Sequence, residues 1–345
     1  MKKLMCILLS VLMLCGCRNS VSNRDETGFI SYIDDAGREL LIEQEINRIM
    51  PSGPISQIVL YALCPEMFVG LGSRWPESAN GIIDEKTLNL SYYGQLYGSA
   101  DLNLEMLSVA APQLILDIGE YKDGISEDLD KITHQTGIST VFVDANLENM
   151  GDVYRKLGQL LHLEERAEEL ASFCDQIYQQ TADIMNQVNG QKVSVLYCQS
   201  EDGLNVLSKG SYHAQMLDWL SENPAVIENG TSKGLGNSVS IEQILLWNPE
   251  VILFADSNAM ENAEKDPAWN QLDAFKNNKV YLVPNVPYSW MGTPPSVQRY
   301  LGMIWLCDLL YPEVCDYDPI EQIRKYYQLF YHCELSDEDI QKMIN

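Results

Sequence analysis

Residues 103–119 (NLEMLSVAAPQLILDIG) and residues 240–256 (SIEQILLWNPEVILFAD) repeat one pattern and align without a gap. Each segment has apolar residues at helical spacing, then a proline, then a short apolar run. That order predicts a helix, a turn and a buried strand. The alignment pairs Glu105 with Glu242 and Pro112 with Pro249. The chain is therefore expected to build the same helix–turn–strand unit twice.

Strands and helices are expected to alternate on both sides of the middle of the chain. A hairpin signal, Asp-Asp-Ala-Gly, is followed by strand-like runs that end at Pro51 and Asp144. Ser52 or Gly53 is expected to cap a helix that has Pro54 near its first position. A strand followed by a loop is expected over residues 67–75, and the second half restarts with a strand over 192–199. This alternation predicts βαβ units and a parallel sheet.

Residues 163–188 differ from their surroundings because no Gly or Pro interrupts an amphipathic pattern. A helix of this length spans about 39 Å at about 1.5 Å per residue. Two interpretations remain open for it. It is either an ordinary long amphipathic helix of one domain or a rigid strut that joins two lobes.

Charge and cysteine content exclude several classes of function. The 345 residues carry 23 Lys and Arg against 49 Asp and Glu, a net charge of −26. Such a surface repels phosphate backbones, so nucleic acid is not an expected partner. Six cysteines follow residue 28 without any Cys-x-x-Cys pair or Cys/His cluster, which favours isolated buried thiols. We therefore expect no metal and no cofactor.

The N-terminal segment is typical of an export signal. Lys2 and Lys3 precede an apolar run that is shorter than the roughly 20 residues of a spanning helix. The sequence that ends at Cys17 resembles a bacterial lipobox, with Cys15 where a smaller residue is more usual. We expect a signal peptide over 1–16, lipidation of Cys17 and a polar tether over 17–28. An ordinary cleaved signal is the alternative.

Taken together, the lipidated signal, the "DDAGREL" and "INRIMPSGP" segments, the paired "NLE" and "SIE" segments and "PPSVQRYLGMIWLCDLLYP" resemble one family. These features are similar to the helix-linked solute-binding proteins of ABC importers, which carry ferric siderophores, haem, cobalamin and, in one branch, molybdate or tungstate. The resemblance implies two Rossmann-like α/β lobes joined by a single long α-helix, as in periplasmic binding proteins. The implied division is 29–147 for the N-terminal lobe, 148–190 for the linking segment and 191–345 for the C-terminal lobe.

The resemblance also implies partners. A membrane-anchored monomer facing the extracytoplasmic side would deliver its ligand to a permease dimer with its ATPase. In the family, one glutamate on each lobe docks to the permease, and the matching positions here are Glu105 and Glu242. The alternative is that both glutamates are there only because the positive dipole end of a helix favours carboxylates in its first turn. An iron chelate or corrinoid is the expected ligand, and an oxyanion of the molybdate type is the alternative.

Ligand is expected between the lobes, at the loops that follow the carboxyl ends of the strands. Aromatic side chains offer contact area there, and cationic side chains suit an anionic chelate or oxyanion. Tyr212, His213 or Met291 could ligate iron if the cargo were haem, although a lone exposed His is more often a surface residue. The candidate ligand-binding residues are Ser52, Gly53, Arg74, Trp75, Tyr92, Tyr93, Tyr97, Glu120, Tyr121, Lys209, Ser211, Tyr212, Tyr288, Trp290, Met291 and Arg299.

An exported two-lobed α/β enzyme is the alternative from another class. Residues 230–234 read Gly-Thr-Ser-Lys-Gly and match G-x-S-x-G. A nucleophile elbow needs a buried strand before it and a helix after it, and the residues around Ser232 favour neither. No catalytic residue is assigned, and we expect a binding protein and not an enzyme.

Overall fold

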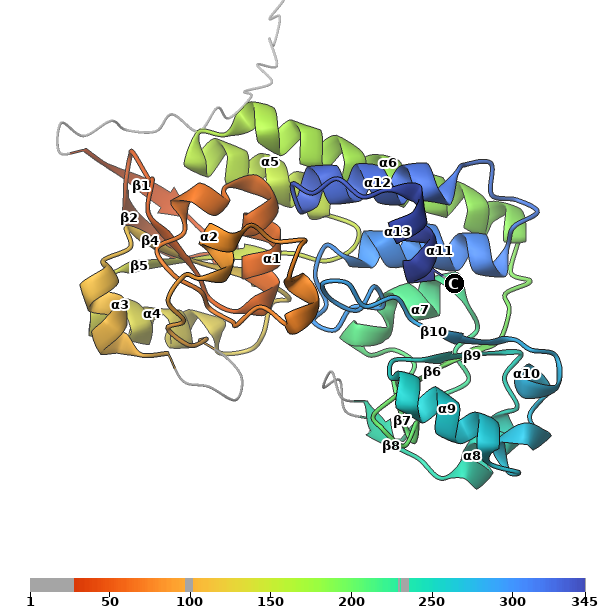
Figure 1. The fold of residues 1–345 in the computed structure, drawn as a ribbon. Helices are drawn as coiled ribbons and strands as arrows, with labels where there is room; N and C mark the ends of the chain where they lie inside the picture. The colour runs from red at the N-terminus through yellow and green to blue at the C-terminus, as the bar shows by residue number, and fades with distance from the viewer. Residues whose placement is uncertain (1–27, 97–101, 229, 231–235, 345) are drawn as a thin grey trace, which may run out of the picture.

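The computed structural model describes residues 28–96, 102–228, 230 and 236–344. The expected signal peptide, Cys17, Tyr97 and Ser232 lie outside the described residues. The chain forms two α/β lobes beside a layer of long helices (Figure 1). The first half contains β1 Phe29–Ile33, β2 Glu39–Glu43, β3 Ile49–Pro51, α1 Pro54–Leu63, α2 Glu85–Leu88, α3 Leu104–Ala110, β4 Leu114–Gly119, α4 Ile125–Thr136, β5 Ser139–Asp144, α5 Met150–Leu161 and α6 Glu164–Val188.

The second half has the same mixed composition. It contains β6 Val195–Gln199, β7 Asn205–Val206, α7 Gln215–Leu220, β8 Asn237–Ser238, α8 Ile241–Trp247, β9 Val251–Phe254, α9 Ser257–Lys265, α10 Asp273–Lys276, β10 Val280–Leu282, α11 Arg299–Leu310, α12 Pro319–Phe330 and α13 Asp337–Ile344. Short 3-10 turns cover Pro65–Met67, Glu77–Ala79, Tyr212–Ala214 and Trp269–Gln271.

The sheet of the first lobe is parallel, in the order β3-β4-β5, and is covered on both faces. Leu114 and Leu116 of β4 belong to the core that includes α1, while Ile115 packs with Leu107 of α3. Successive side chains of a strand point to opposite faces, so a strand of apolar residues packs against helices on both faces of the sheet. The expected parallel sheet is confirmed for this lobe.

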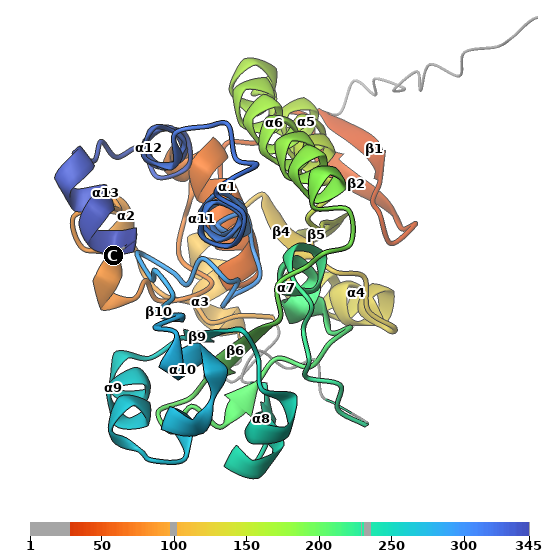
Figure 2. The ribbon, with the colours of Figure 1, turned by 90° about the vertical axis from the view of Figure 1, so that its right-hand side faces the viewer.

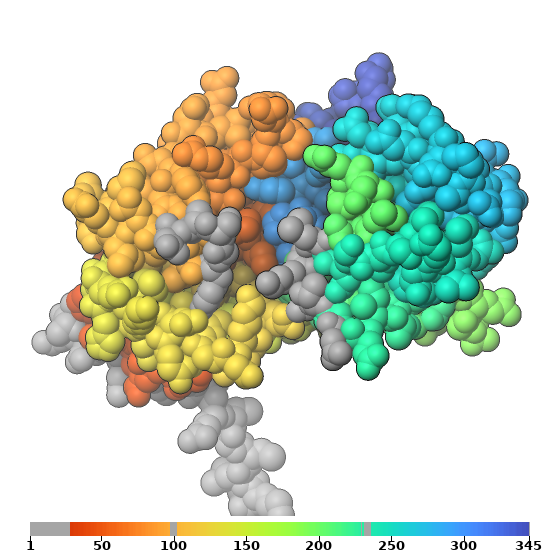
Figure 3. All heavy atoms as spheres, turned by 90° about the horizontal axis from the view of Figure 1, so that it is seen from below, coloured from red at the N-terminus to blue at the C-terminus, as the bar shows by residue number. Residues whose placement is uncertain are grey.

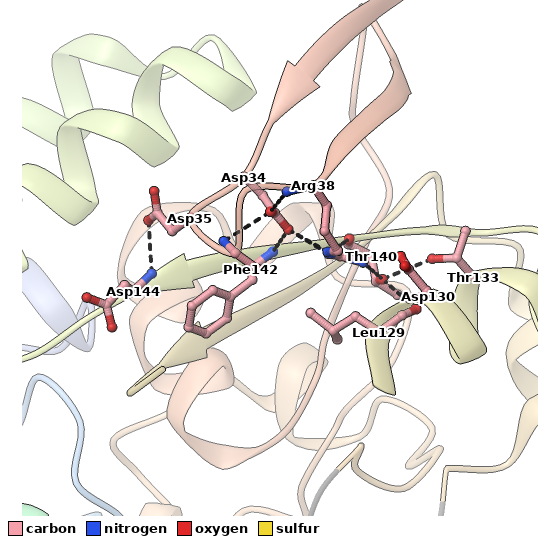
Figure 4. Close-up of polar contacts among 10 residues, drawn as sticks. Asp34, Asp35, Arg38, Leu129, Asp130, Thr133, Thr140, Phe142 and Asp144 are labelled. Atoms are coloured by element: carbon pink, nitrogen blue, oxygen red, sulfur yellow. Dashed lines mark hydrogen bonds and ion pairs between the residues drawn. The ribbon is translucent and has the colours of Figure 1, made fainter. Parts of the chain in front are cut away.

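The β1–β2 hairpin is fixed to this sheet by a buried ion pair (Figure 4). Arg38 lies 2.6 Å from the Asp34 carboxylate, and the same carboxylate accepts a hydrogen bond from the backbone N–H of Phe142 in β5. Arg38 also donates to the carbonyl oxygen of Thr140. The hairpin predicted around Asp-Asp-Ala-Gly is therefore confirmed and anchored to β5.

The second lobe has a mixed sheet in the order β10-β9-β6-β7-β8. β10, β9 and β6 are parallel, and β7 and β8 extend them antiparallel. Tyr197 and Leu253 contribute to the main core, whereas Leu196 and Phe254 pack in a separate core with α8 and α9. Both lobes therefore use the same alternation of faces around an interior strand of the sheet, β4 or β9.

The repeated segments fold in matching ways. Asn103 and Ser240 cap α3 and α8 by accepting a hydrogen bond from the N–H group three residues later. Ala111 and Asn248 end the two helices in the left-handed conformation. Each helix is followed by an interior strand of its sheet, β4 or β9. The predicted helix–turn–strand repeat is confirmed.

The long helix α6 contacts both lobes. It packs against α5 and α1, and Tyr178 on α6 lies with its ring 4.8 Å from Trp219 of α7. The C-terminal helices return across it, because α12 packs on α1, α6 and α11 (Figure 2). Residues 299–344 therefore share the main core with both lobes.

Within residues 67–75 the expected loop is present, but the strand expected before it is reduced to a single bridge. Phe68 makes a single parallel bridge to Ile49, and the chain then turns through Gly70 and Gly72. A side chain at Gly72 would lie 2.5 Å from the carbonyl oxygen of Pro51, so this close approach requires glycine. The loop packs against the end of β3 instead of extending the sheet.

The described cysteines carry no disulfide. Cys64, Cys174, Cys198 and Cys307 are buried, and Cys315 and Cys333 are half-buried. Burial raises the pKa of the Cys198 thiol and keeps it protonated. Over the described ranges no helix combines the length and apolar character needed to cross a bilayer.

Candidate functional site

A cavity of about 610 Å³ lies where the two lobes face each other. Figure 3 views the molecule from the side on which this hollow separates the first lobe from the second. The first lobe supplies the loops after β3 and β4, which is where parallel sheets bind ligands. The cavity is lined by Ser52, Gly53, Pro54, Ile55, Ser56, Gln95, Asp117, Ile118, Gly119, Glu120, Lys122, Ile125, Phe142, Tyr212, His213 and Pro295.

The N-terminus of α1 points at this cavity. Gly53 is its N-cap without a side-chain cap, and Pro54 occupies the first helical position. The first N–H groups of a helix have no partner within it, so those of Ile55 and Ser56 can be offered to a ligand. The dipole of the helix adds a partial positive charge at the same place.

Hydroxyl and carboxyl groups form a small network beneath this helix end. The Ser52 hydroxyl donates to the Asp117 carboxylate over 2.5 Å and lies 2.8 Å from the Ser56 hydroxyl. Asp117 is only 8% exposed, and burial raises its pKa while the Ser52 hydrogen bond opposes that shift. Lys122 also lines the cavity and lowers the pKa of Asp117 by its charge.

The opposite wall comes from the second lobe. The Tyr212 hydroxyl donates across the cleft to the carbonyl oxygen of Ala145 at 3.2 Å. His213 is half-buried, its Nδ1 has no partner within the described chain, and burial lowers its pKa. A second lobe–lobe hydrogen bond runs from the Ser296 hydroxyl to the carbonyl oxygen of Ile55 at 3.1 Å. The cavity is therefore bounded on both sides by polar groups.

Arg299 lies behind the Tyr212 wall. Its guanidinium carbon is 5.2 Å from the centre of the Tyr212 ring, and one Nη donates to the Gln215 side-chain oxygen at 3.3 Å. The side chain is 1% exposed, its Nε has no partner, and no carboxylate pairs with it in the described structure. Burial lowers its pKa. The charge of Glu120 favours the charged form of Arg299, but no direct ion pair offsets the burial of this cation, which is costly.

Four of the sequence candidates line the cavity. Ser52 and Gly53 lie at the helix end, Glu120 follows β4, and Tyr212 comes from the second lobe. Residues far apart in sequence therefore meet, as the position of the loops predicted. Their contact with a ligand stays a prediction.

The aromatic candidates mostly pack against each other. Trp75 lies 5.9 Å from Tyr288, and the Ser78 hydroxyl donates to the Pro287 carbonyl oxygen beside them. Trp290 and Met291 are 0% and 1% exposed. The sequence placed these side chains at the rim, whereas the structure buries them where the segments around 75 and 288 join the lobes. Large apolar rings gain more from that burial than from an exposed loop.

The other candidates surround the site without lining it. Arg74 is exposed and lies over the Tyr92 ring, and Tyr93 packs in the core beside α3. Tyr121 is 51% exposed and rests on Phe142. Lys209 pairs with Glu222, and Ser211 caps the turn that carries Tyr212.

Several residues that line the cavity were not among the candidates from the sequence. Asp117 left a usable signal, because it is the one carboxylate within the apolar run "LILDIG". Ser56 lies in the first turn of α1, and its hydroxyl reaches that of Ser52, which precedes the helix, at 2.8 Å. Gln95, Lys122 and Phe142 carried no such signal, since only the folded chain brings them together.

Glu105 and Glu242 occupy the same position of α3 and α8, in the first turn of each helix, and both are exposed. Hydrogen bonds from its own backbone and from Ser240 lower the pKa of Glu242. Both helices lie away from α6 (Figure 1). The two carboxylates are therefore equivalent and accessible to a partner.

Comparison with known proteins gives a consistent result. The model of the family described as periplasmic binding protein matches residues 95–287. The molybdate-binding protein MolA of Haemophilus influenzae is 32% identical over 153 residues, which cover 44% of this chain and 42% of that protein. The uncharacterized ABC transporter substrate-binding lipoprotein YvrC of Bacillus subtilis is 22% identical over 80% of this chain and 87% of its own. The structure of an ABC transporter solute binding protein from Sulfurospirillum deleyianum has 26% identity and a TM-score of 0.82, covering 91% of this chain and 98% of that one.

Proposed function

Because this chain belongs to the periplasmic binding protein family, we propose that it captures an anionic solute between its lobes and delivers it to an ABC importer. The observation that carries this proposal is the cavity of about 610 Å³ at the N-terminus of α1. Helix N–H groups, serine hydroxyls and Lys122 surround that space, and all of them suit a negatively charged group.

A tetrahedral oxyanion of the molybdate class is the first candidate ligand. Of the aromatic candidates in the described residues, Tyr212 alone lines the cavity, so the lining offers fewer rings to a chelate than the sequence indicated. Small hydroxyls and helix N–H groups match the oxygens of a compact anion. MolA, the relative with 32% identity over part of the chain, is itself named a molybdate-binding protein.

A metal chelate such as a ferric siderophore is the second candidate. A cavity of about 610 Å³ falls within the roughly 300–1,000 Å³ of sites for drug-sized ligands. A bare oxyanion would leave much of that space to water unless the lobes close further. Tyr212 and Phe142 offer such a ligand ring surfaces.

Delivery would follow from the surface and the N-terminus. Lipidation at Cys17 would hold the protein at the extracytoplasmic face of the membrane, on a tether of residues 17–28. Glu105 and Glu242 would then contact the two halves of a permease dimer, one from each lobe. As exposed charges they are expected to affect encounter and orientation more than ligand affinity.

Ligand identity is tested by tryptophan fluorescence titration with molybdate, sulfate, a ferric catecholate, haem and cobalamin. Saturable binding of molybdate at one equivalent supports the first candidate, and saturation by the catecholate alone supports the second. Binding of none of these probes, or chemical turnover of any of them, would refute the proposed role.

Docking is tested in proteoliposomes that contain the cognate permease and ATPase. Glu105→Gln with Glu242→Gln should reduce stimulation of ATP hydrolysis by at least about tenfold, because each removes a charge from the contact. Ligand affinity should stay within twofold of the unmodified protein. If ligand affinity instead falls by a similar factor, the glutamates belong to the ligand-binding site and not to a docking surface.

A further inference from the structure

The most exposed large apolar side chains of the described residues are Val109, at 84%, and Leu246, at 79%. They lie on α3 and α8, the helices of the two repeated segments. The gap-free alignment that pairs Glu105 with Glu242 also pairs Val109 with Leu246. Single exposed apolar residues are common, but two at matching positions of a repeat call for one shared explanation.

Each helix also presents its side chains in the same orientation. Leu107 of α3 and Ile244 of α8 are equivalent in the alignment, and both are fully buried. Residues four apart on a helix are neighbours on its surface, so Val109 lies beside Glu105 and Leu246 lies beside Glu242. Each lobe therefore exposes the same pair, a carboxylate followed by an apolar side chain one turn later.

We propose that Val109 and Leu246 are apolar anchors that seat the two lobes on a two-fold symmetric membrane partner, beside the contacts of Glu105 and Glu242. The proposal rests on the proposed function and names a further part of its docking surface. The occupant expected on each lobe is a permease surface with a cationic side chain next to an apolar recess. Two identical recesses are what the two halves of a symmetric dimer provide.

Charge argues for this occupant over a second copy of the chain. The protein carries a net charge of −26, and both anchors lie next to a carboxylate. Two copies that met through these helices would bring like charges together, which opposes association. A partner with cations at the same spacing satisfies the carboxylates and covers the apolar side chains in one contact.

The test uses the full-length lipoprotein and its permease complex in proteoliposomes. Burial of one such side chain corresponds to about a tenfold effect on affinity or more, so Val109→Ser and Leu246→Ser should each raise the half-maximal concentration for ATPase stimulation about tenfold. The double variant should raise it about a hundredfold. Val226→Ser is the matched control, because Val226 is 73% exposed and belongs to neither repeat.

The outcomes separate this proposal from the docking role of the glutamates. If the glutamate variants lose stimulation and the double serine variant does not, the anchors are refuted while the proposed function stands. If neither set of variants affects stimulation, the proposed function fails as well. An equal loss in Val226→Ser, or a dimer in analytical ultracentrifugation that Leu246→Ser dissociates, would also overturn the proposal.

Discussion

Replacing Arg299 with Met is expected to weaken anion binding without destabilising the protein. The guanidinium carbon of Arg299 lies 5.2 Å from the centre of the Tyr212 ring on one face. An anion in contact with the opposite face would lie about 3.5 Å from the ring. The two charges would therefore be about 9 Å apart. At an effective dielectric constant near 20, unit charges at that distance attract by about 2 kcal/mol. Loss of this attraction corresponds to roughly 20-fold weaker binding.

The free energy of unfolding should respond differently. Arg299 is buried without a carboxylate partner in the described structure, so its removal also removes a desolvation penalty. The cation–π contact with Tyr212 is lost, at about 1–2 kcal/mol, and Met fills most of the same space. We therefore expect a net change in stability within about 1 kcal/mol.

Arg38→Met provides the contrast. Arg38 is also buried, but it pairs with Asp34, whose side chain is fully buried. Removing it leaves an uncompensated carboxylate and should cost about 3–5 kcal/mol of stability. Urea denaturation measures both stabilities, and fluorescence titration with molybdate measures affinity. If Arg299→Met loses more than about 2 kcal/mol of stability and keeps its affinity, Arg299 is a structural residue and the electrostatic argument is wrong.

Three further changes test the cavity and the loop that packs against β3. Asp117→Asn should bind an anion several-fold more tightly at pH 7 because it removes a negative charge. Since burial raises the pKa of Asp117, unmodified affinity should increase as pH falls toward that pKa, and the variant should lack this increase in titrations across pH. Tyr212→Phe removes the hydrogen bond to Ala145 and should weaken binding about two- to tenfold by calorimetry, while an unchanged affinity would mean that this bond does not hold the bound state. Gly72→Ala should lower stability by about 1–3 kcal/mol in urea, because its Cβ would meet the backbone of Pro51 and Gly53, and wild-type stability would contradict that geometry.

Local patterns predicted most of the secondary structure. The hairpin, α1 with Pro54 at its start, the long α6 and both repeated segments follow from side-chain periodicity and capping residues, which act over a few neighbouring positions. The strand expected at the start of residues 67–75 is reduced to one bridge for a long-range reason. Gly72 packs tightly against the backbone of Pro51 and Gly53 at the end of β3. Such a contact between distant backbone segments produces no repeating pattern of apolar residues, so the sequence does not reveal it.

The sequence predicted which loops form the candidate site better than it predicted which side chains line it. Loops after β3 and β4 line the cavity as expected, because the ends of parallel strands share one edge of a sheet. Trp290 and Met291 are instead buried in the core, and Gln95 and Phe142 line the cavity. Which way a loop side chain turns depends on segments that meet it only after folding.

The sequence by itself determined the two-fold repetition, the acidic surface and the order of strands and helices, since these depend on composition and on contacts within one element. Only the tertiary structure decided that Val109 and Leu246 stand exposed beside equivalent glutamates and that Arg299 is buried without a direct ion pair. Exposure and charge pairing are properties of the surroundings, and packing between distant segments creates those surroundings.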